Sequence, residues 1–108
     1  TGDVYALKVM SKSAVIVKNQ VSYIRNERDI AARTTNPYLV RFYYAFQTRD
    51  CLYIAMEYCP GGDLYSLLHA LDTFDDDMTR QYAAEVVEAI GYLHSAGIVH
   101  RDLKPDNL

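Results

Sequence analysis

The sequence has few of the residues that build metal centres and disulfide frameworks. Of its 108 residues, two are cysteine and three are histidine, and tryptophan is absent. Cys51 and Cys59 have no metal-ligand spacing and no companion histidine cluster. We therefore interpret them as free thiols in a reducing compartment, and neither a zinc module nor a disulfide scaffold is expected.

The sequence also lacks an excess of positive charge and a long apolar run. Eleven Lys and Arg residues against fourteen Asp and Glu residues give a net charge of −3, with both signs mixed along the chain. A nucleic-acid-binding module normally carries a basic stripe, so no nucleic-acid partner is expected. No stretch approaches the roughly 18 apolar residues of a membrane span, and no secretion signal is evident. We expect an intracellular protein, cytoplasmic or nuclear, without membrane insertion.

The first half of the sequence has the alternation of β-strands around one helix. Residues 4–10 alternate with period two, which predicts a strand with Lys8 on an otherwise apolar face. Residues 39–46 and 52–58 predict two further strands, joined as an antiparallel hairpin at residues 47–50. Residues 19–33 predict a helix, and its apolar stripe is expected to comprise Val17, Val21, Ile24 and Ala31.

Two charges interrupt these apolar faces. Glu27 lies on the helical stripe, where a carboxylate is costly unless it is paired. Arg25 and Arg28 could pair with it locally, and Lys8 could simply protect a sheet edge. The alternative is that Glu27 reaches across to Lys8 and forms a buried ion pair, so that each charge explains the other.

The second half of the sequence is helical. Pro60-Gly61-Gly62 marks the change, and residues 63–69 predict a short helix. Asp75 to Asp77 supply an N-cap and an acidic first turn for a longer helix, and Gly97 suits its C-terminal end. The apolar stripe of that helix is expected to comprise Met78, Tyr82, Val86, Ala89, Ile90 and Leu93. The fold class predicted is therefore α+β, divided near residues 59 and 60.

The last residues read HRDLKPDNL, from His100 to Leu108. Pro105, Asp106 and Asn107 are typical of an exposed turn. A turn alone does not explain why so many titratable side chains follow an apolar run.

This stretch resembles the catalytic loop of eukaryotic protein kinases, in the HRDLKPxN form typical of serine/threonine kinases. Residues 5–8, YALK, resemble the family's third-strand motif, and Glu27 lies where the αC glutamate is expected. Residues 56–64 resemble the gatekeeper, the hinge and the first helix of the second lobe. Residues 26–30 and 56–64 are similar to the AGC group, and residues 62–68 with 100–108 to its microtubule-associated/Greatwall-like branch, which includes the plant root-hair-elongation kinases.

The resemblance implies part of the bilobal protein-kinase fold. Residues 1–59 would form a sheet-rich portion of the N-lobe with the αC helix, and residues 60–108 the start of the helical C-lobe. The Gly-rich phosphate loop and the DFG motif of the family have no counterpart in the sequence, so we expect this chain to be a fragment that is inactive by itself. Membership of the AGC group would also imply regulation through αC and a hydrophobic motif elsewhere in the chain.

The resemblance implies ATP and Mg²⁺ as cofactors. Lys8 would bind the α- and β-phosphates and Glu27 would hold it in place. Adenine would lie near Ala6 and Leu64, with Met56 as gatekeeper. The main chain of the hinge would supply the hydrogen bonds to adenine, so side-chain contacts there are not expected, and Cys59 is expected to be a small half-buried residue. The residues implied for ATP binding are Lys8, Glu27, Ala6, Met56, Glu57, Cys59, Asp63 and Leu64.

The closing loop would carry the chemistry. Asp102 would act as the catalytic base for a serine or threonine hydroxyl of a protein substrate, and Lys104 would neutralise charge on the transferred phosphoryl group. Asn107 would bind Mg²⁺ through its amide oxygen. His100 is expected to pack in the core, and Arg101 to await an acidic or phosphorylated partner.

Two carboxylates suggest a preference among protein substrates. Asp63 and Asp106 would face the peptide and favour Arg or Lys a few residues before the phosphoacceptor. The alternative is that Asp63 only begins a helix and Asp106 only shapes a turn.

Three other functions were weighed. A pseudokinase or scaffold would keep the fold without catalysis, and this is the main alternative. A small-molecule kinase of the aminoglycoside-phosphotransferase type would share a His-x-Asp-xxxx-Asn loop but lack Arg101 and the Lys104-Pro105 pair. A generic α+β interaction domain would leave Lys8, Glu27 and the closing cluster as coincidences, and is rejected.

Overall fold

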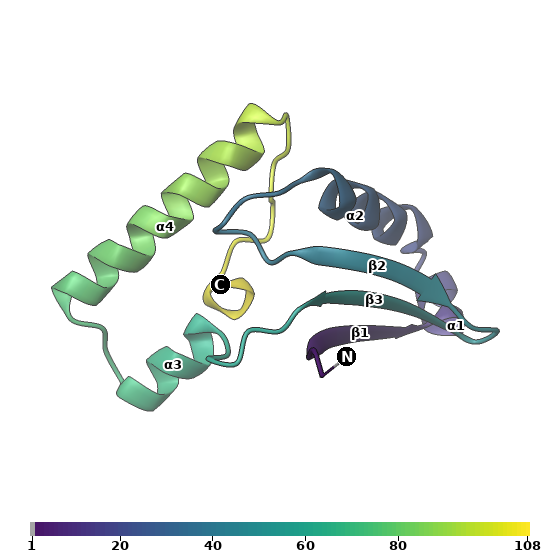
Figure 1. Ribbon diagram of the computed structural model, residues 1–108, viewed down its shortest axis with the longest axis horizontal. Helices are drawn as coiled ribbons and strands as arrows, with labels where there is room; N and C mark the ends of the chain where they lie inside the picture. Colours follow the sequence, from purple (N-terminus) through teal and green to yellow (C-terminus); the bar gives the residue numbers. More distant parts are fainter. Residues whose placement is uncertain (1) are drawn as a thin grey trace. The chain divides into compact units, whose positions relative to one another are not determined.

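The computed structural model describes residues 2–108, apart from the side chain of Tyr23. The chain forms two compact units, Thr1–Cys59 and Pro60–Leu108, which are described separately below (Figure 1). The first contains a sheet and two helices, and the second is helical. The prediction of an α+β fold is thereby confirmed.

A three-stranded antiparallel sheet forms the centre of the first unit. Strand β1 comprises Tyr5–Ser11, β2 Phe42–Gln47 and β3 Cys51–Glu57, in the order β1-β3-β2. The predicted hairpin is the pair β2–β3, whose register shifts at a bulge between Phe42 and Tyr44. The middle strand carries two of the buried residues, Ile54 and Ala55, because it is flanked by a strand on both sides.

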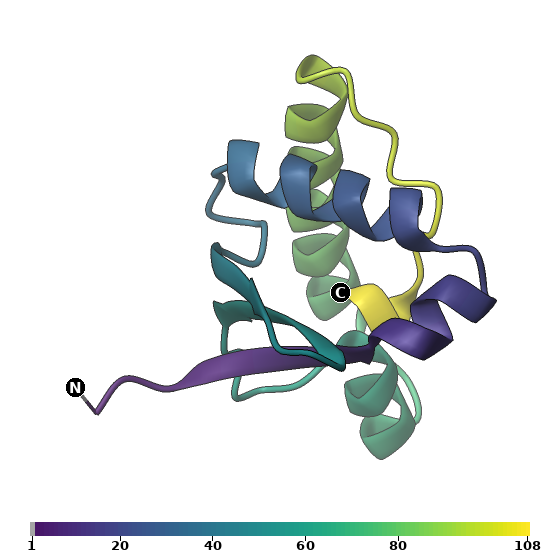
Figure 2. The same ribbon diagram turned by 90° about the vertical axis from the view of Figure 1, so that its right-hand side faces the viewer.

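Helix α2, Val21–Arg33, lies along one face of this sheet (Figures 1 and 2). Its half-buried side chains include Val21, Ile24, Glu27 and Ala31, which is the predicted stripe with its carboxylate in place. The first member predicted for that stripe, Val17, was assigned wrongly. It ends a separate short helix, α1, Lys12–Val17, and is 84% exposed.

Helix α1 was not predicted from the sequence. Its Val-Ile-Val run has low helix propensity because β-branched side chains lose rotamer freedom in a helix. The helix forms around Val15, which is buried in the first unit. Asn19, with φ of 53°, then reverses the chain before α2 begins. Asn is one of the few residues that tolerate this left-handed conformation.

Helix α4, Asp76–Ser95, is the longest element of the second unit. The Asp75 carboxylate caps it by accepting a hydrogen bond from the Met78 N–H at 2.8 Å. The side chains of its predicted apolar stripe are half-buried, apart from Leu93, which is buried. Gly97, with φ of 76°, follows the C-cap Ala96, where the left-handed conformation favours glycine.

Helix α3, Leu64–Leu71, and the short 3₁₀ helix η1, Pro105–Asn107, pack against each other within the second unit (Figure 1). The Leu64 N–H donates to the Leu108 carbonyl at 2.8 Å. This main-chain hydrogen bond ties the start of α3 to the end of the closing loop. No helix among residues 2–108 is long and apolar enough to cross a membrane.

Candidate active site

The closing loop is organised around Asp102. Lys104 Nζ lies 3.6 Å from Asp102 Oδ1, and Asn107 Nδ2 donates to the Asp102 main-chain carbonyl at 2.8 Å and to Oδ2 at 3.3 Å. The Asp102 N–H donates to His100 Nδ1 at 3.2 Å. The structure therefore brings together the carboxylate, the amine and the amide that the sequence analysis selected as the reacting groups.

The loop is exposed throughout, and this corrects one prediction. His100 was expected to pack in the core, but it is exposed and its ring accepts a hydrogen bond from the loop itself. This hydrogen bond holds the His100 ring within the exposed loop. Between the two residues Arg101 adopts φ of 69°, a left-handed conformation that is rare for non-glycine residues, and the chain bends there. This turn allows His100 and Asp102 to meet. Such outliers are concentrated at functional sites, and local sequence pattern gave no signal for it.

Asp63 caps α3, and it lies in the same unit as the closing loop. Its Oδ1 accepts a hydrogen bond from the Ser66 N–H at 2.7 Å, so the helix-starting role weighed for it is present. A carboxylate has a second oxygen, and that oxygen can still accept a hydrogen bond from a ligand. Leu64 follows directly and is bonded to Leu108, while Asp106 is exposed in η1.

The first unit brings Lys8 and Glu27 together. Lys8 Nζ lies 3.4 Å from Glu27 Oε1, which links strand β1 to helix α2. The pair was expected to be buried, but the two side chains are 44% and 43% exposed. Water therefore reaches both groups. Local pairing of Glu27 with an arginine is not seen among the described residues, and Arg28 pairs with Asp29 instead.

The sheet register assembles three further residues predicted to bind ATP. Ala6 on β1 is the direct cross-strand partner of Met56 on β3. Lys8 is two residues beyond Ala6 and shares its face, because side chains alternate along a strand. Glu57 ends β3, and its carboxylate accepts a hydrogen bond from the Arg41 N–H at 3.0 Å. The side chain of Glu57 thus has a partner that the sequence analysis did not foresee.

Cys59 follows the strand and is exposed, where a half-buried position was expected. It lies in an irregular segment after the end of β3, where no neighbouring strand covers it. Cys51, at the start of β3, is partly buried, and both cysteines are free as predicted.

An aromatic cluster flanks the end of β3. The rings of Tyr5 and Tyr43 meet edge to face with centroids 5.0 Å apart, and the Arg41 guanidinium lies over Tyr43, 5.3 Å from its centroid. The neighbouring Tyr44 is the main cause that raises the pKa of Tyr5, followed by desolvation and by Asp3. Tyr5 therefore remains a neutral phenol at physiological pH.

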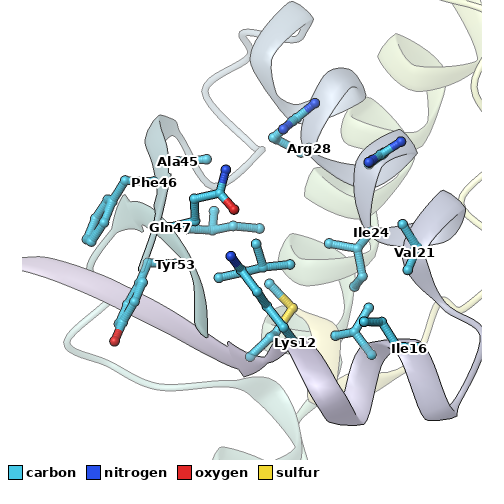
Figure 3. Close-up of a pocket in the computed structure, with 14 residues that line it drawn as sticks. Lys12, Ile16, Val21, Ile24, Arg28, Ala45, Phe46, Gln47 and Tyr53 are labelled. Atoms are coloured by element: carbon cyan, nitrogen blue, oxygen red, sulfur yellow. The ribbon is translucent and has the colours of Figure 1, made fainter. Parts of the chain in front are cut away.

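A pocket of about 370 Å³ opens elsewhere in the first unit, between α1, α2 and the sheet. Figure 3 shows Ile16, Val21 and Ile24 gathered on its helical side, with Phe46 and Tyr53 on the sheet side. Lys12, Arg25 and Arg28 add positive charge to this lining. Neither Lys8 nor Glu27 lines it, so this pocket is distinct from the predicted nucleotide site. It was not predicted, because α1 was not.

The donor atoms of the closing loop fit a magnesium ion. Mg²⁺ prefers oxygen ligands and keeps several waters, so one or two protein oxygens suffice. Asn107 uses Nδ2 within the loop, which leaves its amide oxygen on the opposite side to face a cation. No cluster of three His, Cys, Asp or Glu side chains that could hold a metal occurs within residues 2–108, so any ion here would depend on few protein ligands.

The closing loop of the second unit is suited to proton abstraction beside a hard cation, and the first unit, described by itself, holds a lysine against a glutamate. Comparison with known proteins agrees, since residues 1–108 match the family described as protein kinase domain. The chain is 57% identical over its whole length to "Probable serine/threonine protein kinase IREH1" of Arabidopsis thaliana, and covers 8% of that protein. It is 53% identical over its whole length to "Probable serine/threonine-protein kinase pkgA" of Dictyostelium discoideum, again covering 8%.

A further relative is "Serine/threonine-protein kinase WARTS homolog" of Caenorhabditis elegans, which is 47% identical over the whole chain, with 12% of that protein covered. The chain belongs to the protein kinase domain family. It spans about a tenth of the length of these curated relatives. Use of ATP and Mg²⁺ is general in this family.

Proposed function

We propose that the protein containing this chain is a serine/threonine protein kinase that transfers the γ-phosphoryl group of ATP to protein hydroxyls. The observation that carries this proposal is the closing loop, in which Lys104, Asn107 and His100 all contact Asp102. The family match and the printed names of the relatives support the same activity.

Asp102 is the proposed catalytic base. Its carboxylate would accept or orient the proton of the substrate hydroxyl, while Lys104, 3.6 Å away, would offset charge on the phosphoryl group. Asn107 would hold Mg²⁺ through its amide oxygen and keep Asp102 in place through its amide nitrogen. The ion, when bound, neutralises charge on the phosphate oxygens.

The resemblance implies nucleotide ligands in each of the two units. Lys8, oriented by Glu27, would bind the α- and β-phosphates. The adjacent Ala6 and Met56 would contact adenine, as would Leu64 from the start of α3. The main chain of Glu57 and Cys59 would supply hydrogen bonds, and Asp63 would offer its second carboxylate oxygen to the ribose.

Substitution of Asp102 by Asn in the full-length protein tests the assignment. The change is nearly isosteric and leaves the nucleotide ligands intact, so we expect phosphotransfer to a protein substrate to fall by at least about a hundredfold, as for loss of a general base. The Kd for ATP should change by less than about threefold. The control is Glu88→Gln, which alters an exposed carboxylate on helix α4 of the same unit, to which no role in binding or catalysis is assigned. Undiminished phosphotransfer by Asp102→Asn would refute the role of Asp102.

A preference for basic residues upstream of the phosphoacceptor is also proposed. Asp63 and Asp106 place carboxylates on α3 and η1, which pack together and would give the peptide-facing side a negative field. We expect a peptide array to select Arg or Lys before the phosphoacceptor, and Asp63→Ala and Asp106→Ala each to relax that selection. A flat profile, or selection of acidic residues, would show that these carboxylates serve only the nucleotide and the fold.

We propose that the protein belongs to the AGC group, because residues 26–30 and 56–64 resemble that group. The resemblance implies a regulatory hydrophobic motif that acts through αC, and we propose the pocket between α1, α2 and the sheet as its binding site, because apolar and basic side chains line it. A location in the cytoplasm or nucleus is proposed as well, and imaging of the tagged full-length protein would test it.

The main alternative is a pseudokinase or scaffold. It would bind ATP without transferring phosphate, and the intact Asp102 cluster gives no support for it. Phosphotransfer that is lost in Asp102→Asn would exclude it.

A further inference from the structure

The residue that begins the hinge, Glu57, is paired irregularly with the start of β2. Its N–H donates to the Arg41 carbonyl at 2.7 Å, which is one half of a regular antiparallel pair. In a regular pair the Arg41 N–H would donate back to the Glu57 carbonyl. It donates instead to the Glu57 carboxylate, Oε2, at 3.0 Å. Within the part of the chain that the structure describes, the second main-chain hydrogen bond of this pair does not form.

The β-bulge explains why this pairing is irregular. The register places Phe42 opposite Met56 and Tyr44 opposite Ala55, so Tyr43 is an extra residue on β2. A bulge bends its strand and disrupts the ladder locally. Arg41 lies just before it, and its guanidinium is held over the Tyr43 ring. Arg41 therefore lies at the edge of the regular ladder, where its N–H can bond to either acceptor of Glu57, and it bonds to the carboxylate.

The irregular pairing has a consequence for the Glu57 carbonyl. The N–H and C=O of one residue in an antiparallel strand point toward the same neighbour. The Glu57 carbonyl is therefore expected to point toward β2. It is not expected to accept a hydrogen bond from β1, although the register places Tyr5 of β1 opposite Glu57. With the Arg41 N–H held by the carboxylate, this carbonyl has no donor from β2. Since no donor from β2 occupies it among the described residues, it can accept a hydrogen bond from a ligand.

We propose that the Glu57 side chain is a positioning residue for adenine, because it occupies the Arg41 N–H and so keeps the Glu57 main-chain carbonyl open to the 6-amino group of the base. This inference rests on the proposed function, since it requires ATP at the hinge. A carboxylate is a stronger acceptor than a neutral carbonyl, so the Arg41 N–H stays with it. The side chain acts through the main chain and does not touch the nucleotide.

Removal of the Glu57 carboxylate is expected to weaken the binding of nucleotides that have a 6-amino group and no others. In Glu57→Ala the Arg41 N–H turns to the Glu57 carbonyl, as in a regular ladder, and competes with the 6-amino group. Weakening one hydrogen bond of ordinary strength raises the Kd for ATP by about two- to tenfold. Purine riboside triphosphate has the same ring and phosphates but no 6-amino group, so its Kd stays the same.

The experiment measures Kd for both nucleotides in the full-length protein by isothermal titration. Glu57→Gln keeps an acceptor oxygen and should restore the ratio of the two Kd values to that of the unsubstituted protein. Glu57→Leu, which keeps the bulk of the side chain, should behave as Glu57→Ala. The matched control is Asp50→Ala, a carboxylate in the turn at the opposite end of the β2–β3 hairpin, which should leave the ratio unchanged.

The ratio of the Kd values for the two nucleotides distinguishes a loss of positioning at the hinge from a loss of folded protein. A misfolded fraction lowers the binding of both nucleotides alike, so it leaves the ratio of the Kd values unaltered. Equal weakening of both nucleotides, or an unchanged ratio in Glu57→Ala and Glu57→Leu, would overturn the inference and leave the proposed kinase activity standing. Failure of the unsubstituted protein to bind either nucleotide would overturn both.

Discussion

The ion pair between Lys8 and Glu27 offers the sharpest test of how this unit works. Replacement of Glu27 by Gln removes the charge but keeps the size of the side chain. The pair is 3.4 Å long, and its side chains are 44% and 43% exposed. An ion pair so accessible to water contributes less than about 1 kcal/mol to stability. We therefore expect the free energy of unfolding to fall by less than that amount.

The expected effect on catalysis is larger. Without Glu27 the flexible Lys8 side chain loses the contact that orients it toward the phosphates, and misplacement of a positioning group lowers the rate far more than it lowers stability. We expect kcat/KM for ATP to fall at least about tenfold, which corresponds to about 1.4 kcal/mol of transition-state stabilisation. Lys8→Met should lower it further. The double variant should be little worse than Lys8→Met, because both changes disable one unit.

The measurement of kcat/KM uses initial rates of peptide phosphorylation across a range of ATP concentrations. Urea unfolding of the same preparations gives the free energy of unfolding. The control is Asp29→Asn, which breaks the Arg28–Asp29 ion pair of the same helix, 3.2 Å long with side chains 48% and 62% exposed. It should change stability as little as Glu27→Gln does and leave kcat/KM within about twofold. Additive losses in the double variant, or an equal loss in Asp29→Asn, would refute the reasoning.

Two further predictions concern stability. Asp75→Ala removes the cap of α4 and should lower the free energy of unfolding of the full-length protein, measured in urea, by about 1 kcal/mol. Asp76→Ala removes only a first-turn charge and should lower that free energy clearly less. Equal losses would mean that the cap hydrogen bond is not responsible. The 108-residue chain by itself should unfold without a cooperative calorimetric transition, because its described core is very small. A sharp heat-absorption peak would contradict this. The buried hydrophobic side chains among the described residues are Val15, Ile54, Ala55 and Leu93.

Much of the fold could be predicted from local sequence. The stripes of α2 and α4 follow from helical periodicity, and the hairpin follows from alternation around a polar turn. Asp63 and Asp75 cap their helices as their residue type and position indicate. These features depend on neighbours within a few residues, so the sequence pattern contains the information for them.

The closing loop was predicted in part. Its residue types and spacing indicate the catalytic groups, and the structure gathers Lys104 and Asn107 around Asp102. The exposure of His100 and the left-handed Arg101 were not predicted. A positive φ at a non-glycine residue is a strained choice that hydrogen bonds around it stabilise, and residue preference argues against it.

The sequence by itself determined the three strands, the helices α2, α3 and α4, where α3 and α4 begin, and which charges need explanation. Only the tertiary structure decided that α1 forms despite its β-branched run, because Val15 is buried there, and that Val17 lies in water. It also decided that Glu57 bonds to Arg41, since that contact depends on a bulge in the pairing of two strands. The position of a bulge arises from the pairing of segments that lie apart in the sequence, and the alternation within one strand does not show where it falls.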